Sequence, residues 1–424
     1  MIITKKSLLN IIMFSLIFIL SFCFRTPLFG IIMILTTLIY GIKIIFKQNF
    51  TIKIIIIFIL LYNMTFLYYF IAGIQISYYT QFNQFEYIYT VALLCYVFSI
   101  TFFWQLNKIK SKEIYIQLKD NSLLYIVFIC IFIVMFLRGI DGKIGDYRAI
   151  ELSTATEYSV LFFLLAFLFT GEKKIRKHIL CIICGCFAIY AIMIGSRIVG
   201  IQFLMAIFLL NDFVIIKNIK YSSNNIKQNL YIIYILLGVL VMKGFGAIRS
   251  NGFSINKLVE AMFSTSVVDN MIMNNQSDVI YSTMSLIAMK DLKIINLEVI
   301  IKSFFAHING IFLPSSINGI YGNFPKFVVE NSLNYGGGGG FFFGPIYIWF
   351  GIVGVGVFSI ILGRIIKNAY DNKPSDIVKF YILILLVTFF RWYPYTIYGI
   401  YKLPLYGLII YLLANMLHNT MKRR

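Results

Sequence analysis

The sequence predicts an all-α polytopic membrane protein with about twelve transmembrane helices and one large loop on the outer side of the membrane. Two features of the composition support this fold class. Of the 424 residues, 60% are hydrophobic and 13% are charged, whereas about 25% of the residues of a soluble domain are charged. The apolar residues gather in runs of roughly 14 to 23 residues, and a helix of about 20 residues crosses the hydrocarbon core of a bilayer. A soluble enzyme is therefore excluded.

Nine predicted spans precede the large loop and three follow it. We place them at 7–24, 28–46, 52–74, 87–104, 122–137, 158–171, 178–194, 198–216, 230–247, 342–362, 377–390 and 403–417. The chain is thereby divided into a nine-span region over 1–247, an outer loop over 248–341 and a three-span region over 342–424. The first span follows Lys5 and Lys6 as in a signal sequence, but no small-x-small cleavage motif follows it, so we expect it to remain as an anchor.

The formal charge of +20 would suggest a nucleic-acid ligand in a soluble chain, but here the basic residues follow the predicted topology. If the N-terminus is cytoplasmic, the inner segments hold 23 of the 37 lysines and arginines and the short outer segments hold 7. The other 7 lie in the long segment 243–341, most of which is the large outer loop, and such a loop crosses the membrane largely regardless of its charge. We therefore expect both termini to be cytoplasmic, and we expect no nucleic-acid partner.

Metal and cofactor motifs are missing from the sequence. All six cysteines fall inside predicted spans, three of them in the run CIICGC, where small packing residues are expected rather than metal ligands. The outer segments contain no H-E-x-x-H, no P-loop and no Asp-x-Asp pair. We therefore expect no metal and no cofactor.

The large outer loop contains one segment that is apolar enough to resemble a further span, Ile294–Phe312. It carries Glu298 and Lys302 four residues apart, and counting it as a span would place the basic residues between 364 and 379 outside. We therefore predict an amphipathic helix that lies in the outer membrane interface. A glycine run, Gly336–Gly340, follows, and we interpret residues 294–340 as a mobile gate with these glycines as its hinge; a passive linker is the alternative.

Arginine is concentrated on the predicted outer side. Six of the ten arginines lie there, among 14 basic residues, whereas only four of the 23 inner basic residues are arginines. The six are Arg25, Arg138, Arg148, Arg197, Arg249 and Arg391. Positive charge alone sets topology, but a planar guanidinium also binds phosphate or carboxylate through two parallel hydrogen bonds. An anionic ligand on the outer face is therefore predicted, with interfacial arginines that only anchor the protein as the alternative.

The short turn Gly195-Ser196-Arg197 gives the most specific anion site. Ser196 is placed to cap the eighth span, so the positive end of that helix faces outward next to Arg197. A phosphate at this helix start would relieve the repulsion between the helix dipole and the guanidinium.

A proton acceptor on the same side has several candidates. His307 is the only outer histidine, and a neutral imidazole is a suitable general base for a sugar hydroxyl. The alternative is a histidine that merely lies on the amphipathic helix. Asp141, Asp146 and Glu330 are carboxylate candidates that the sequence does not rank.

Four segments resemble a known family. They are GDYRAIEL with Arg148, MIGSRIVGIQF with Arg197, NYGGGGGFFFGPIYIWFGIVGVG at the tenth span, and RWYPYT with Arg391. In these segments and in its layout the chain resembles the Wzy-type O-antigen and capsular polysaccharide polymerases, which are O-antigen ligase-like membrane glycosyltransferases. The Arg-x10-Gly pattern of some members is absent, because Phe208 stands at that distance from Arg197.

The resemblance implies polymerisation of undecaprenyl-pyrophosphate-linked oligosaccharide repeat units into O-antigen, as in lipopolysaccharide biosynthesis, at the periplasmic face of the bacterial inner membrane. The pyrophosphate leaving group already carries the activation, so a metal-independent glycosyltransferase is expected. We assign catalysis to His307, Glu330 and Asp146. Pyrophosphate and substrate binding are assigned to the set Arg148, Ser196, Arg197, Arg249, Arg391, Tyr335 and Gly337. Expected partners are the lipid-linked oligosaccharide, membrane lipids and a polysaccharide chain-length regulator.

Three other functions stay open at this point. An O-antigen ligase has the same layout and differs mainly in its acceptor. A lipid-linked oligosaccharide flippase also has about twelve spans, but it would carry charged residues along a central path, and these spans are nearly free of charge. A membrane acyltransferase would need a histidine such as His178 near a cytoplasmic acyl donor.

Overall fold

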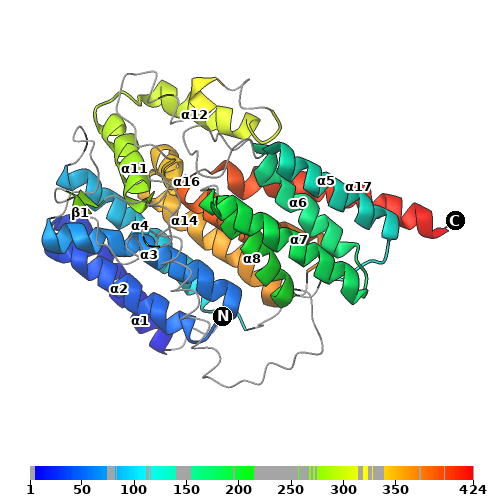
Figure 1. The fold of residues 1–424 in the computed structure, drawn as a ribbon. Coiled ribbons are helices and arrows are strands. Elements are labelled where there is room, and N and C mark those ends of the chain that lie inside the picture. The colour runs from blue at the N-terminus through cyan, green and yellow to red at the C-terminus, as the bar shows by residue number, and fades with distance from the viewer. Residues whose placement is uncertain are drawn as a thin grey trace. The chain divides into compact units, whose positions relative to one another are not determined.

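The computed structural model describes most of the helical chain (Figure 1). The described residues are 5–73, 82, 84–110, 114, 116–139, 154–193, 196–213, 256, 267–268, 271–272, 275–313, 319–322, 327, 339–371, 374–395 and 397–423. The long elements among them are all α-helices. One antiparallel pair of two-residue strands, β1 (Val267–Val268) and β2 (Met271–Ile272), is the exception within these ranges. An all-α protein was predicted, and the described part of the chain confirms it.

The chain forms two compact units. The first comprises Met1–Lys112, Ser266–Asn372 and Arg391–Lys402, and the second comprises Glu113–Thr265, Lys373–Phe390 and Leu403–Arg424. Both units therefore combine residues from the N-terminal and C-terminal parts of the chain.

The first unit is built around α4 (Phe85–Leu106). Its other elements are α1 (Lys5–Cys23), α2 (Pro27–Ile45), α3 (Phe50–Ala72), α11 (Asn275–Asp291), α12 (Leu297–Asn309), the 3-10 turn η1 (Ile320–Gly322) and α14 (Phe343–Asp371). Most of α4 is buried because it packs against α2, α11 and α14 (Figure 1). Side chains start two of these helices: Thr26 and Asn49 accept hydrogen bonds from backbone N–H groups in the first turns of α2 and α3.

The described part of the second unit contains five complete helices. They are α5 (Ser122–Gly139), α6 (Thr154–Leu168), α7 (Lys174–Met193), α8 (Arg197–Phe213) and α15 (Asp376–Val387), joined by most of α17 (Tyr398–Arg423). The short helix α16 (Phe389–Tyr395) and the start of α17 lie in the first unit from Arg391 onward.

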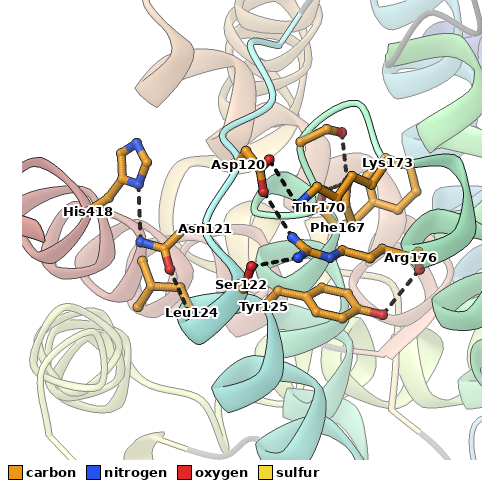
Figure 2. Close-up of polar contacts among 11 residues, drawn as sticks. Asp120, Asn121, Ser122, Leu124, Tyr125, Phe167, Thr170, Lys173, Arg176 and His418 are labelled. Carbon is orange, nitrogen blue, oxygen red and sulfur yellow. Dashed lines mark hydrogen bonds and ion pairs between the residues drawn. The ribbon is translucent and has the colours of Figure 1, made fainter. Parts of the chain in front are cut away.

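A polar cluster connects the start of α5 with the start of α7 in the second unit (Figure 2). Asp120 accepts a hydrogen bond of 2.9 Å from the Arg176 guanidinium and lies 3.3 Å from the Lys173 ammonium. The same guanidinium donates to the Ser122 hydroxyl at 2.6 Å, and the Tyr125 hydroxyl donates to the Arg176 carbonyl at 3.2 Å. Asp120 thus offsets two of the basic residues that the sequence places on the inner side.

Seven described helices are long and apolar enough to cross a membrane, and the bent pair of α15 and α16, with an angle of 60°, would be an eighth. The seven are 27–45, 50–72, 85–106, 122–139, 174–193, 343–371 and 398–422. Several apolar helices of this kind suggest a membrane-embedded protein. The apolar parts of α1, α6 and α8 are shorter, and the predicted span 230–247 lies outside the described residues. Twelve spans and the sidedness of the loops therefore remain predictions.

The segment predicted as one large outer loop contains a buried helix, α11, that the sequence analysis did not predict. Its side chains from Val279 to Met289 are buried, and it packs against α3, α4 and α14. Its sequence is rich in serine and threonine, which lowers its hydropathy. Two of these hydroxyls are satisfied within the helix, because Thr283 and Ser285 donate to the carbonyls of Val279 and Tyr281. The hydropathy of the sequence therefore hid an internal helix.

The predicted amphipathic helix is present as α12. Its charged pair, Glu298 and Lys302, is exposed, with 2.5 Å between carboxylate and ammonium. The apolar side chains of Leu297, Ile301 and Phe305 form an exposed stripe, while Ser303 and His307 are buried against the unit. This pattern of buried and exposed residues is typical of a helix that packs against the protein with one face and contacts an apolar environment with another.

Candidate functional site

The structure describes only some of the predicted site residues. His307 and Arg391 belong to the first unit, and Ser196 and Arg197 belong to the second. Six predicted residues lie outside the described residues, namely Asp146, Arg148, Arg249, Glu330, Tyr335 and Gly337. The site is therefore built here from the first unit, which contains two of the described site residues, His307 and Arg391.

His307 lies on α12 but is buried, because only 6% of its surface is exposed. Its Nδ1 lies 2.8 Å from the Ser303 carbonyl oxygen, one turn earlier. The ring stacks on Tyr398 with 4.7 Å between centroids and 6° between planes, and it meets Trp349 edge to face at 4.7 Å. Three elements distant in the sequence therefore fix this imidazole.

Further hydrogen bonds connect the same elements. The Trp349 indole donates to the Ser303 hydroxyl at 3.0 Å, and the Tyr401 hydroxyl donates to the His307 carbonyl at 3.3 Å. These contacts hold α12 against α14 and the start of α17. The helix of the predicted gate is therefore attached to the unit through Ser303 and His307.

Burial lowers the pKa of His307 from 6.5 to about 4, and the Ser303 carbonyl offsets only part of this effect. The ring is neutral at pH 7 in consequence. A neutral imidazole whose Nδ1 faces a carbonyl carries its proton there, which leaves the basic lone pair on Nε2. Its low basicity makes His307 a weak proton acceptor, because general bases act best when their pKa lies near the working pH.

An open apolar groove of about 510 Å³ runs beside His307. Side chains of α12 and α14 and of the segment entering α17 line it. They are Phe304, His307, Ile308, Ile311, Ile346, Trp349, Phe350, Val353, Gly354, Val357, Phe358, Ile361, Ile397 and Tyr401. Only His307, Trp349 and Tyr401 bring polar atoms, so the groove suits an alkyl or isoprenoid chain better than a sugar.

The described end of the glycine run is tightly packed. Phe342 donates its backbone N–H to the Tyr393 carbonyl at 3.1 Å, and Phe341 donates to the Thr283 hydroxyl at 2.9 Å. A Cβ at Gly339 would overlap the carbonyl oxygen of Tyr395. At this end the run therefore serves as a close backbone contact with α16, which differs from the expected hinge. Gly336 to Gly338 lie outside the described residues.

Arg391 is held at the start of an aromatic helix. Its guanidinium carbon lies 5.4 Å from the centroid of the Tyr395 ring. The next two residues, Trp392 and Tyr393, are fully buried, and Tyr393 meets Tyr62 edge to face at 5.6 Å. The aromatic core thus fixes the backbone that carries this arginine.

In the second unit, α8 begins at Arg197 as predicted. Ser196 precedes it, with its N–H donating to the Ala191 carbonyl at 2.8 Å and its own carbonyl accepting from Gly200 at 3.0 Å. The predicted start of this helix directly after Ser196 is confirmed. Anion binding at this start remains a prediction.

One group of charged residues was not singled out from the sequence. Burial raises the pKa of Asp291, at the end of α11, while the charges of Lys290 and Arg25 lower it and that of Glu86 raises it. These four residues come from three segments of the first unit, so no local motif could have revealed them. Asp291 is thus a further carboxylate beside one of the predicted outer arginines.

No family model, curated protein or solved structure matches the chain. The family resemblance of the four short segments is therefore carried forward as a proposal.

Proposed function

We propose that this chain polymerises undecaprenyl-pyrophosphate-linked oligosaccharide repeat units into O-antigen or a related surface polysaccharide, at the periplasmic face of the inner membrane. The apolar groove between α12 and α14 is the observation that carries this proposal. A polyprenyl tail is the part of such a substrate that needs an apolar surface beside the bilayer. The amphipathic α12 would then lie where the lipid-linked sugar emerges from the membrane.

In the proposed reaction, an acceptor hydroxyl of one lipid-linked repeat unit attacks the anomeric carbon of the growing glycan. The bond from that carbon to the pyrophosphate oxygen breaks, undecaprenyl pyrophosphate leaves, and the hydroxyl proton passes to a base. The outer arginines Arg148, Arg197, Arg249 and Arg391 would stabilise the departing pyrophosphate. Since the leaving group is already activated, the reaction needs no nucleotide.

The base requires a revised assignment within this proposal. His307 is 6% exposed, and its ring is held by the Ser303 carbonyl, Tyr398 and Trp349, which suits a residue that positions the wall of the groove. Its pKa of about 4 makes it no more basic than an ordinary carboxylate. We therefore propose Asp146 or Glu330 as the base and His307 as a positioning residue.

Deletion of the gene in the host, followed by separation of its surface glycan by length, tests the reaction class. Loss of a polymerase leaves single repeat units on the acceptor lipid. Loss of a ligase leaves the lipid core without glycan, and loss of a flippase traps units inside the cell. A glycan pattern of either of the last two kinds would contradict the proposal.

A groove variant links the phenotype to the structure. Val353 lines the groove and is 72% exposed, so Val353→Trp would fill part of it with little disturbance of the core. We expect shorter glycans from this variant at normal protein levels. Ile189→Trp is the matched control, because Ile189 is 59% exposed on α7 and does not line the groove. Full-length glycan from Val353→Trp would show that polymerisation does not require this groove.

A further inference from the structure

A second lipid-facing feature of the first unit lies where α4 and α14 end together. These helices approach closely, since a Cβ at Gly363 would lie 2.6 Å from the Cβ of Gln105. This contact brings Lys108, just after α4, near Arg364 and Lys367 on α14. The charges of both α14 residues act on Lys108.

The cations in this cluster exceed the carboxylates. Lys367 pairs with Asp371 at 2.9 Å, and the same carboxylate accepts the Lys110 backbone N–H at 2.9 Å. No ion pair to a described carboxylate is seen for Lys108 or Arg364. Three cations and one carboxylate leave a formal charge of +2. Each helix C-terminus supplies only about half a negative charge, and only within its last turn.

The excess of positive charge affects the pKa of Lys108. Burial and the charges of Arg364 and Lys367 lower the pKa of Lys108 to about 8. Its ammonium lies 3.0 Å from the centroid of the Trp104 ring, which holds the charge near the helix ends. The second unit differs at its own basic end, where Asp120 pairs with Lys173 and Arg176 (Figure 2).

The apolar surface next to the cations indicates the kind of anion. Val357, Ile361 and Ile365 are exposed at spacings of four residues and therefore follow one face of α14. Arg364 stands on the same face at its end. A free phosphate would need only the cations, whereas a phospholipid would place its phosphate on the cations and its acyl chain on this stripe.

We propose that Lys108, Arg364 and Lys367 bind the headgroup phosphate of an anionic phospholipid whose acyl chain lies along α14. From Val353 to Arg364, eleven residues of helix rise about 16 Å, so this headgroup is well separated from the His307 end of the groove. The acyl-chain stripe shares Val357 and Ile361 with the groove, but the headgroup site lies on other residues, and its test does not depend on the proposed polymerase activity.

The test is native mass spectrometry of the purified full-length chain in a neutral detergent, titrated with phosphatidylglycerol or with phosphatidylcholine of the same acyl chains. We expect tighter binding of phosphatidylglycerol. Lys108→Gln and Arg364→Gln should each weaken it about five-fold, as expected for one basic residue near an anionic headgroup. Arg364→Lys keeps the charge and should stay within about two-fold.

Lys174→Gln is the matched control, since Lys174 is an exposed base of the second unit on the same predicted side. It should leave phosphatidylglycerol binding unchanged, and all variants should elute as the wild type does in size exclusion. Unchanged affinity in both glutamine variants, or equal affinity for the two lipids, would overturn the proposal. Displacement of the lipid by an equal concentration of glycerol phosphate would instead show a site for free phosphate, and would overturn it too.

Discussion

The buried neutral histidine makes a quantitative prediction about stability and pH. The pKa of His307 is about 4 in the folded chain and has its ordinary value of 6.5 when unfolded. Below pH 6.5 the unfolded state therefore takes up a proton that the folded state does not, so acid favours unfolding. Stability that is fully present above pH 6.5 should be lost as the pH falls toward 4, by up to about 1.4 kcal/mol per pH unit.

At pH 5 this effect amounts to about 2 kcal/mol relative to pH 7.5. His307→Phe keeps an aromatic ring that can stack on Tyr398 and meet Trp349 edge to face, but it removes the titrating group. We expect the variant to lose less stability than the wild type on going from pH 7.5 to pH 5. The assay is denaturant unfolding of the purified protein in detergent at both pH values, followed by tryptophan fluorescence.

His178→Phe provides the control, because His178 is an exposed histidine of α7. Its loss of stability with acid should equal that of the wild type. If His307→Phe and the wild type lose the same free energy between the two pH values, His307 is not a buried neutral group, and its role in holding α12 would have to be abandoned.

Further predictions follow from the packing, the topology and the predicted anion site. Gly339→Ala should lower the free energy of unfolding by about 1–3 kcal/mol, because its methyl group overlaps the Tyr395 carbonyl. Gly185→Ala should be neutral or stabilising in the same denaturant titration, since its Cβ would meet no atom within 4 Å apart from its chain neighbours and its own helix backbone, and equal effects of the two would contradict the close contact. Reporter fusions at Ser222, Asn270 and Asn372 should report inside, outside and inside, and an inside signal at Asn270 would reverse the topology. Arg197→Lys should abolish most glycan polymerisation at normal protein levels, because the charge remains but the bidentate donor is lost; full-length glycan from it would show that the guanidinium is not needed.

The local features of the fold were predictable from the sequence. Hydropathy located most of the described apolar helices to within about four residues, although α14 ends nine residues beyond the predicted span 342–362 and α17 extends five to six residues beyond 403–417 at its two ends. The spacing of Glu298 and Lys302 identified α12 as amphipathic. The start of α8 at Arg197 followed from Ser196 as a capping residue. These features depend on residues within one or two turns of each other.

Features that depend on distant contacts were not predictable. The helix α11 was hidden because its serine and threonine residues lower its hydropathy, although the hydroxyls of Thr283 and Ser285 are satisfied by carbonyls of the same helix. The burial of His307 depends on Trp349 and Tyr398, which follow it by 42 and 91 positions in the sequence. The groove likewise forms only when α12 packs on α14, so no single segment contains its signal.

The proposed function is tested most directly by reconstituting the purified full-length chain with undecaprenyl-pyrophosphate-linked repeat units in vesicles, without nucleotide or added metal. The account predicts a ladder of glycans of increasing length, with one undecaprenyl pyrophosphate released for each unit added and a shorter ladder from Val353→Trp. Folded wild-type protein that yields no product longer than one repeat unit would contradict it.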